Sequence, residues 1–306
     1  MKVLSVDSVS KVYKTGTFGR SETVAVSDVS FSIAGGEIVA LIGESGSGKT
    51  TLGKMILGLT PVTTGRITFD GSVVSTARSR DLRQYYRHVQ GVFQDPFSSY
   101  NPIFKADRVF GLVRRAYFPG MADSEWTRKL ERALEAVSLN PGDVLDKYPH
   151  QLSGGQLQRL LIARALLLEL QILVADEVIS MLDASTRVDV LNLLAELSGR
   201  GLGIVFITHD LALGSYISDS TVILHRGRIV ERGTTEKVFG NPMHAYTKKL
   251  LDSVPHLGSR WMNEPRHLAV VDDLAVETPS DGPLVEIEKD HFVLQVTSPG
   301  HSRHGR

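Results

Sequence analysis

Cysteine is absent from this chain of 306 residues. Without thiols the chain can form no disulfide, thiolate metal site or iron–sulfur cluster, and it has no need of an oxidising compartment. An excess of either charge is absent too, because 34 Lys and Arg balance 34 Asp and Glu. The overall charge therefore gives no indication of nucleic acid or an acidic membrane surface as a partner.

Long apolar runs are also lacking. The start of the chain, Met1 to Asp7, has no apolar segment typical of a secretion signal. The most apolar stretch, Leu160 to Met181, is interrupted by charged and polar residues. We therefore expect a chain that is neither secreted nor membrane-spanning. With 42% hydrophobic residues, it can bury a full core, which favours one large domain or a domain with an appendage.

The apolar patterns predict an α/β fold. Residues 24–33 alternate between apolar and polar side chains, as in a half-buried antiparallel strand of a small β subdomain. Residues 37–42 form a continuous apolar strand that leads through glycines into a predicted helix at 51–57. Further buried strands are predicted at 171–175, 202–208 and 221–224, with a helix at 187–197. This order predicts a mostly parallel sheet.

Two other regions differ in pattern. Helical spacing dominates between residues 101 and 170, so we expect an inserted helical subdomain at about 97–170. After Gly258 the composition shifts toward Pro, Asp, Glu and Val, which predicts a main domain at 1–258 and a C-terminal appendage at 259–306. Short apolar runs at 284–288 and 292–294 predict a β-hairpin that packs on the main domain or mediates a dimer contact, and packing is preferred.

Residues 43–50, Gly-Glu-Ser-Gly-Ser-Gly-Lys-Thr, match the pattern G-x-x-x-x-G-K-[ST] in full. The glycines let backbone N–H groups turn toward phosphates, Lys49 balances the β and γ charges, and the Thr50 hydroxyl can ligate Mg²⁺. The N-terminus of the following helix adds a favourable dipole. A Gly/Ser-rich turn that matches by chance is the alternative, but the preceding strand and following helix favour a nucleoside triphosphate site.

A second motif is the apolar stretch Ile172 to Ala175, which ends in Asp176 and Glu177. The Asp176 carboxylate can lie beside Mg²⁺, and Glu177 can orient or deprotonate the attacking water. Taken without the loop, the two residues could be a solvated pair at a strand end. A third motif, Leu152-Ser153-Gly154-Gly155-Gln156, precedes a predicted helix at 157–167 and is either a second anion-binding helix start or a plain N-cap.

Together these motifs resemble the ATP-binding cassette family over about residues 3–254. The 152–156 segment is similar to the family signature, and Gln94 lies in a stretch similar to the Q-loop. Residues 180–183 resemble the D-loop, His209 the switch histidine, and Tyr13 the aromatic residue that stacks on adenine. The six motifs occur in the family's order.

The resemblance implies a P-loop NTPase core in which two cassettes face each other head to tail, with ATP and Mg²⁺ bound. Glu177 would polarise water, His209 would contact the γ-phosphate, Asp183 would bridge the two cassettes, and the signature of each cassette would close the ATP site of the other. The implied ATP-binding residues are Tyr13, Gly43, Glu44, Ser45, Gly46, Ser47, Gly48, Lys49, Thr50, Thr51 and Gln94. The implied Mg²⁺ residues are Thr50, Gln94 and Asp176, and the implied signature contacts are Ser153, Gly154, Gly155 and Gln156.

Within the family, residues 93–102 and 241–251 are similar to the ATPase subunits of oligopeptide, dipeptide and nickel importers. This similarity implies two transmembrane permease subunits, an extracytoplasmic solute-binding protein, and a peripheral position at the cytoplasmic face of the inner membrane. Residues 52–53 and 58–61 favour the second of two different ATPases, so a heterodimer is preferred over a homodimer. Oligopeptides or dipeptides are the preferred cargo, with nickel import, oligosaccharide import or export as alternatives.

Two departures and two rival classes bear on this interpretation. The cysteines that many members carry near the C-terminus are absent, and Val178-Ile179 stands where Pro-Thr is usual, although we expect ATPase function to survive. A nucleic-acid-associated cassette ATPase would carry a basic surface or a second set of motifs, and neither is found. A cassette that serves only as a structural partner would have lost Lys49, Ser153 or Glu177, and all three are present.

Overall fold

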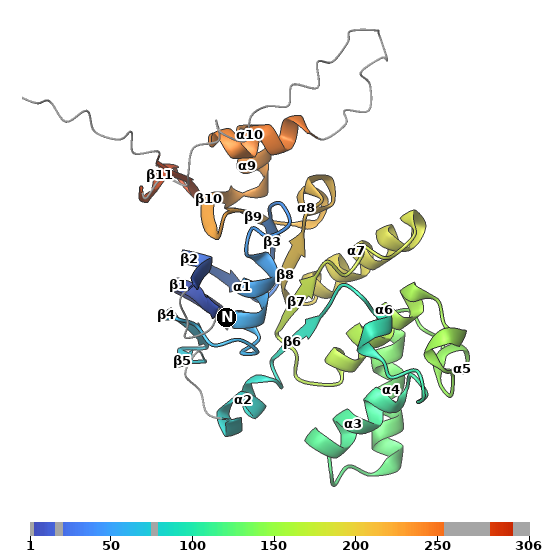
Figure 1. Cartoon of the computed structure of the whole chain (residues 1–306). Helices are drawn as coiled ribbons and strands as arrows, with labels where there is room; N and C mark the ends of the chain where they lie inside the picture. The colour runs from blue at the N-terminus through green and yellow to red at the C-terminus, as the bar shows by residue number, and fades with distance from the viewer. Residues whose placement is uncertain (1–2, 16–20, 75–78, 254–281, 296–306) are drawn as a thin grey trace, which may run out of the picture.

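The computed structural model describes residues 3–15, 21–74, 79–253 and 282–295. Figure 1 shows a small β-sheet on one side of a central sheet and a group of helices, α3 to α6, on the other. The mixed α/β fold predicted from the sequence is confirmed. No helix within the described part of the chain combines the length and the apolar character needed to cross a membrane.

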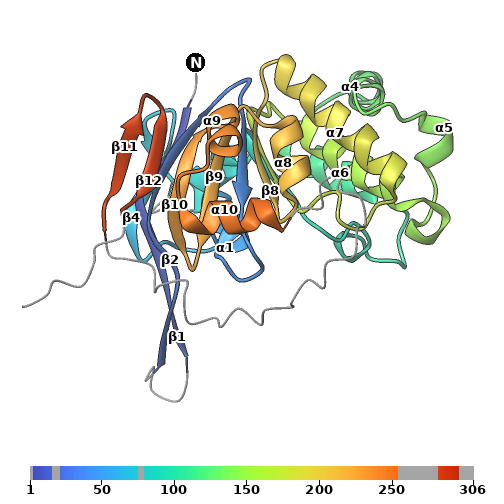
Figure 2. The same ribbon diagram turned by 90° about the horizontal axis from the view of Figure 1, so that it is seen from above.

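The small sheet is antiparallel and has the strand order β2-β1-β4-β5. These strands span Val3–Thr15 (β1), Ser21–Ala34 (β2), Thr64–Phe69 (β4) and Ser72–Val73 (β5). In β2 the side chains of Val29, Phe31 and Ile33 are buried and alternate with more exposed ones, which confirms the expected half-buried strand. Figure 2 shows the ends of β1 and β2 extending beyond the body of the molecule as a two-stranded ribbon.

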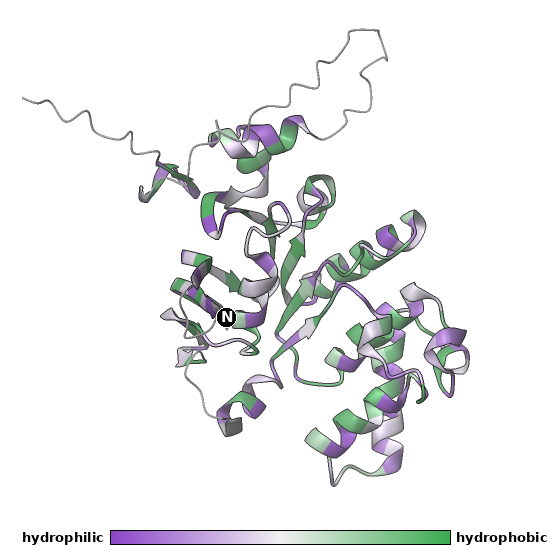
Figure 3. Ribbon diagram, viewed as in Figure 1, coloured by the Kyte–Doolittle hydropathy of each residue, from purple (hydrophilic) through white to green (hydrophobic). Residues whose placement is uncertain are grey.

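The central sheet has the order β11-β12-β10-β9-β3-β8-β7-β6. Its five consecutive parallel strands are Val89–Val92 (β6), Ile172–Asp176 (β7), Gly203–Thr208 (β8), Ile38–Ile42 (β3) and Ser220–His225 (β9). Every residue of β3, β7 and β8 is buried. Continuous apolar strands of this kind need cover on both faces, and Figure 3 shows their hydrophobic character against the more polar outer helices.

Strand β8 shows how the two faces are covered. Val205 and Ile207 belong to a core shared with the small sheet and with α1 (Lys49–Ile56). Ile204 and Phe206 point to the other face, into a core shared with α6 (Gly154–Leu166) and α7 (Ala184–Gly199). Since the side chains of a strand alternate in direction, both cores are held together by the same short strand.

The remaining helices complete the outer layers. They are α2 (Ser79–Tyr85), α3 (Arg108–Tyr117), α4 (Asp123–Glu135), α5 (Pro141–Val144), α8 (Leu211–Ile217), α9 (Thr235–Gly240) and α10 (Ala245–Asp252). Helices α3 to α6 lie within the residues expected to be helical, 97–170. The bounds proposed for the domains stay a prediction, and the boundary at residue 258 lies outside the described residues.

The expected C-terminal hairpin is present. It consists of Leu284–Glu288 (β11) and His291–Leu294 (β12), which pair antiparallel. Strand β12 also pairs with Arg228–Thr234 (β10), so the hairpin extends the central sheet. Because Val293 and Leu294 are buried there, the hairpin packs on the main domain as preferred from the sequence.

Candidate functional site

The 43–50 loop connects β3 to α1, as its sequence predicts. Two of its glycines are required by close approaches of the backbone. A Cβ atom on Gly43 would lie 2.2 Å from the Leu224 carbonyl oxygen, and one on Gly48 would lie 2.4 Å from that of Ala25. Gly48 also has φ of 104°, a conformation that glycine adopts without a steric penalty. The loop is therefore fitted closely between β9 and β2.

The side chains of the loop divide into exposed and buried groups. Glu44, Ser45 and Gly46 are exposed at its tip. Ser47 is buried, with its hydroxyl 3.4 Å from Lys49 Nζ. Thr51 is half-buried in the first turn of α1. The exposed tip leaves room for a ligand to meet the N–H groups that precede the helix.

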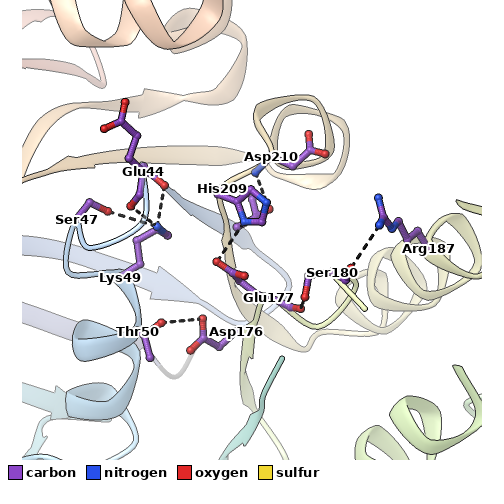
Figure 4. A network of polar contacts seen from close by, with 12 residues as sticks. Glu44, Ser47, Lys49, Thr50, Asp176, Glu177, Ser180, Arg187, His209 and Asp210 are labelled. Carbon is purple, nitrogen blue, oxygen red and sulfur yellow. Dashed lines mark hydrogen bonds and ion pairs between the residues drawn. The ribbon is translucent and has the colours of Figure 1, made fainter. Parts of the chain in front are cut away.

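Lys49 is buried, and its ammonium group donates to the carbonyl oxygens of Gly43 at 2.7 Å and Glu44 at 2.8 Å. Figure 4 shows it between the loop and the carboxylates of Asp176 and Glu177. Burial lowers the pKa of Lys49 from its usual value, while the nearby charges of Glu177 and Asp176 act in the opposite direction. A buried cation whose partners are mainly carbonyls is placed to attract an anion.

Asp176 ends β7 and lies beside the loop. Its Oδ1 accepts a hydrogen bond from Thr50 Oγ1 at 3.3 Å, and the residue is only 6% exposed. Burial raises the pKa of Asp176, and the neighbouring Glu177 adds to the effect, whereas the Thr50 hydrogen bond opposes it. The structure brings these two predicted Mg²⁺ residues together.

The fit to Mg²⁺ can be judged from the donors. Among the described residues no group of three or more His, Cys, Asp or Glu side chains gathers into a metal site. Mg²⁺ is commonly bound by one or two protein oxygens together with phosphates and water. A hydroxyl and a buried carboxylate beside a phosphate-binding loop match that donor set.

Glu177 and His209 meet at the carboxyl ends of β7 and β8, with Glu177 Oε1 3.2 Å from His209 Nδ1. The Glu177 backbone has φ of 50°, which is uncommon for a residue other than glycine. It is fixed there because its N–H donates to Ile207 O at 2.9 Å. Val178 and Ile179, which replace the usual Pro-Thr, are buried. The conformation therefore leaves the Glu177 carboxylate partly exposed toward the His209 ring, while the next two residues enter the core.

The segment after Glu177 is held by contacts that the sequence did not reveal. Ser180 Oγ donates to Glu177 O at 2.9 Å, and Arg187 of α7 donates to Ser180 O and to Leu182 O. Asp183 caps α7, because its Oδ1 accepts from the backbone N–H of Thr186 at 3.0 Å. That N–H and two neighbouring hydroxyl groups lower the pKa of Asp183. The residues of the predicted D-loop are therefore held by hydrogen bonds up to the first turn of α7. Their contact with a second cassette stays a prediction.

The signature segment forms the start of α6. Ser153 Oγ accepts from Gln156 N–H at 3.2 Å, and Gln156 Oε1 accepts from Ser153 N–H at 2.9 Å, which makes a capping box. Gly154 lies near Leu182. A Cβ on the buried Gly155 would lie 2.4 Å from Thr186 Cγ2. Signature and D-loop thus pack directly on each other, a long-range contact that the sequence alone did not indicate.

This second helix start is not near the phosphate loop of the same chain. Helix α6 and helix α1 lie on opposite sides of β6 and β7 (Figures 1 and 2). Within the described ranges no hydrogen bond joins residues 153–156 to residues 43–50. The chain therefore carries two separate helix starts, one at the phosphate loop and one at the signature segment.

Two of the predicted ATP-binding residues, Gln94 and Tyr13, lie outside the phosphate loop and the carboxylate pair. Gln94 is exposed just beyond β6, which pairs with β7 so that Val92 lies opposite Ala175, next to Asp176. Tyr13 is 38% exposed on β1 and pairs with Thr23. The Ala25 carbonyl, two residues further along β2, is the one against Gly48. Gln94 thus follows the strand next to Asp176, and Tyr13 lies on the strand pair that packs on Gly48. Their contact with a nucleotide stays a prediction.

Comparison with known protein families matches two separate regions of the chain. Residues 26–180 match the family described as ABC transporter. Residues 230–273 match the family described as oligopeptide/dipeptide transporter, C-terminal region. The first match contains the loop, both carboxylates and the signature.

Individual relatives agree with these matches. A Brucella ovis protein named for peptide import and ATP binding is 44% identical over 83% of this chain and 78% of its own length. The oligopeptide transport ATP-binding protein OppF of Streptococcus pyogenes is 39% identical over 90% of each chain. The dimeric structure of a post-hydrolysis ATP-binding cassette bound to ADP and Pi has a TM-score of 0.67 and 28% identity, covering 76% of this chain and 98% of that one.

Proposed function

Because the chain belongs to the ATP-binding cassette transporter family and is an ATPase, we propose that its ATP hydrolysis drives the import of oligopeptides or dipeptides. The observation that carries the proposal is the match of residues 230–273 to the C-terminal region of oligopeptide and dipeptide transporters. The relatives named for peptide import and oligopeptide transport support it.

In the proposed mechanism, ATP binds with its phosphates on the 43–50 loop and its adenine against Tyr13. The backbone N–H groups at the start of α1 would face the phosphates, and the Lys49 ammonium would balance their charge. Thr50, Asp176 and Gln94 would hold Mg²⁺, which would neutralise charge on the β and γ phosphates. These residues bind and orient the nucleotide.

Glu177 and His209 act on the bond that breaks. The Glu177 carboxylate accepts a proton from the attacking water, whose oxygen bonds to the γ-phosphorus as the bond to the ADP oxygen breaks. His209 stands 3.2 Å from that carboxylate and donates toward the γ-phosphate. Most of the acceleration is electrostatic positioning, because phosphoryl transfer needs little covalent help from the protein.

A second cassette completes the site in this proposal. The signature of one chain lies away from its own loop, so two chains placed head to tail would each supply Ser153, Gly154, Gly155 and Gln156 to the other's ATP. Asp183 would lie at the contact between them. The dimeric state of the solved cassette supports the pairing of two cassettes, and a heterodimer is preferred over a homodimer.

We propose that the permease subunits contact a groove beside Gln94. The groove has a volume of about 520 Å³ and lies between the turn that follows α1, strand β6, and helices α3 and α6. Its lining includes Leu59 and Leu112, whose apolar side chains are 57% and 47% exposed. The chain would then sit at the cytoplasmic face of the membrane with two permeases, supplied by an extracytoplasmic solute-binding protein.

The test of the cargo is co-purification of the tagged chain from membranes. We expect recovery with a second ATPase and two permeases, and a cognate binding protein whose melting temperature rises with peptides rather than nickel or oligosaccharides. Recovery with ribosomes or DNA would overturn the transport proposal, and stabilisation by nickel or a sugar alone would overturn the cargo.

The loop itself is tested by Lys49→Ala. We expect this variant to lose ATP binding in a fluorescence assay, because the buried cation that faces the phosphates is gone. The control is Lys54→Ala, which makes the same change at an exposed position of α1 and should bind ATP as the native chain does. Undiminished ATP binding by Lys49→Ala would contradict the assignment of the loop.

A further inference from the structure

A residue of the C-terminal region contacts the phosphate loop directly. The backbone N–H of Glu44, second residue of the loop, donates to the hydroxyl oxygen of Tyr246 at 3.2 Å. Tyr246 lies in α10, 202 residues further along the chain, and is only 2% exposed. Both residues border a cavity of about 260 Å³ beside the loop, together with Arg226 and Lys249.

The geometry of a peptide group makes this contact specific. The Glu44 N–H and the Gly43 carbonyl belong to one planar peptide unit and point in opposite directions. The carbonyl accepts from Lys49 Nζ at 2.7 Å while the N–H donates to Tyr246. The peptide unit that holds the Lys49 ammonium is therefore clamped from its other end by Tyr246.

Tyr246 has little freedom to move. Its ring packs in a core with Ala40 and Ile42 of β3 and with Leu294 of the C-terminal hairpin. The centroid of its ring lies 3.9 Å from that of His225. Burial raises the pKa of Tyr246, so the hydroxyl stays protonated near neutral pH. The acceptor for the Glu44 N–H is thus held in place by the sheet.

A buried charge fixes the start of α10. Glu231 of β10 is fully buried, and its two carboxylate oxygens accept from the backbone N–H groups of Met243 at 2.8 Å and His244 at 2.9 Å. His291 of β12 approaches the same carboxylate through Nε2 at 2.7 Å. His244 Nδ1 in turn accepts from the Tyr246 N–H at 3.1 Å. A buried carboxylate is tolerated when its oxygens are satisfied in this way.

We infer that Tyr246 is a positioning residue of the nucleotide site, and that Glu231 and His291 connect the C-terminal hairpin to it. The inference rests on the proposed role of the 43–50 loop. Through this chain of contacts the region that matches the oligopeptide/dipeptide transporter family sets the orientation of the peptide unit behind Lys49. The C-terminal region thereby influences the affinity of the 43–50 loop for ATP.

Tyr246→Phe removes only the hydroxyl group and keeps the ring. In the purified transport complex we expect the KM for ATP to rise about 2- to 10-fold, the range of one hydrogen bond, with kcat nearly unchanged at saturating ATP. The Kd of the isolated chain for a fluorescent ATP analogue should rise by the same factor. The control is Tyr216→Phe, which removes an exposed hydroxyl from α8 and should leave both values unchanged.

The outcomes separate a positioning role from a structural one. A fall in melting temperature with unchanged Kd and KM would overturn the inference, because a purely structural hydroxyl affects stability alone. If Lys49→Ala also kept full affinity, the proposed loop function would fail as well. Loss of affinity in Lys49→Ala with native affinity in Tyr246→Phe refutes only the role of Tyr246.

The connection to the hairpin has its own variants. His291→Leu removes the group that approaches Glu231, and we expect it to raise the Kd in the same direction as Tyr246→Phe. His291→Gln restores a donor and should return the Kd toward the native value. Native affinity in a folded His291→Leu chain would refute the part played by the hairpin, while the Tyr246→Phe measurement decides the contact with the loop in either case.

Discussion

Replacement of Glu177 by glutamine separates ATP binding from hydrolysis. The amide has nearly the size of the carboxylate, and the backbone at this residue is fixed by the N–H bond to Ile207 O rather than by the side chain. The contact with His209 Nδ1, 3.2 Å away, can be kept by the amide oxygen. The variant should therefore fold normally and bind Mg–ATP with native affinity, since the change removes only a proton acceptor.

The expected loss of rate follows from that single change. A positioned general base contributes about 10²- to 10⁴-fold, so kcat should fall by that factor, which corresponds to about 3–5 kcal/mol in the activation barrier. Phosphate release by the purified complex at saturating Mg–ATP measures it, and Glu131→Gln on the exposed face of α4 is the matched control. A decrease of less than tenfold with intact binding would show that Glu177 does not handle the water.

Three further variants test neighbouring contacts. Gly155→Ala should lower the free energy of unfolding by about 1–3 kcal/mol, because the new Cβ would meet Thr186 Cγ2. Adding Thr186→Ser to the same chain removes that methyl group and should recover most of the loss in a denaturant titration. No recovery would refute the contact. For Asp176, burial raises the folded-state pKa, so its contribution to stability is present at low pH and is lost as pH rises through that pKa. Asp176→Asn should remove this pH dependence and raise the melting temperature of the nucleotide-free chain at neutral pH. It should also weaken Mg–ATP binding. An unchanged dependence of the melting temperature on pH would contradict the raised pKa of Asp176. His209→Gln should lower kcat about 10²- to 10³-fold in the phosphate-release assay, as expected for a lost donor to the transition state, and native kcat would exclude that role.

The parts of the site that could be predicted are local in sequence. The turn from β3 into α1, the carboxylates that end β7 and the helix start at Ser153 each arise from neighbouring residues with a strong pattern. Glycine spacing and apolar runs report such features directly. For the same reason the α/β fold and the C-terminal hairpin could be predicted from the sequence.

The contacts that could not be predicted join distant residues. Nothing in the spacing around Tyr246 indicates that its hydroxyl meets the phosphate loop, and nothing around Gly155 indicates that Thr186 fills the space beside it. Asp183 is instructive in another way, because its place directly before α7 could have been interpreted as an N-cap. Periodicity gives the face of an element but not the partner that covers it.

The most direct test of ATP-driven peptide import is ATP hydrolysis by the complete complex in lipid vesicles, before and after addition of peptide-loaded binding protein. We predict that the loaded binding protein stimulates phosphate release and drives peptide uptake, and that Glu177→Gln abolishes both while the complex still assembles and binds ATP. Equal stimulation in the Glu177→Gln complex, or peptide uptake that continues without ATP, would contradict this prediction.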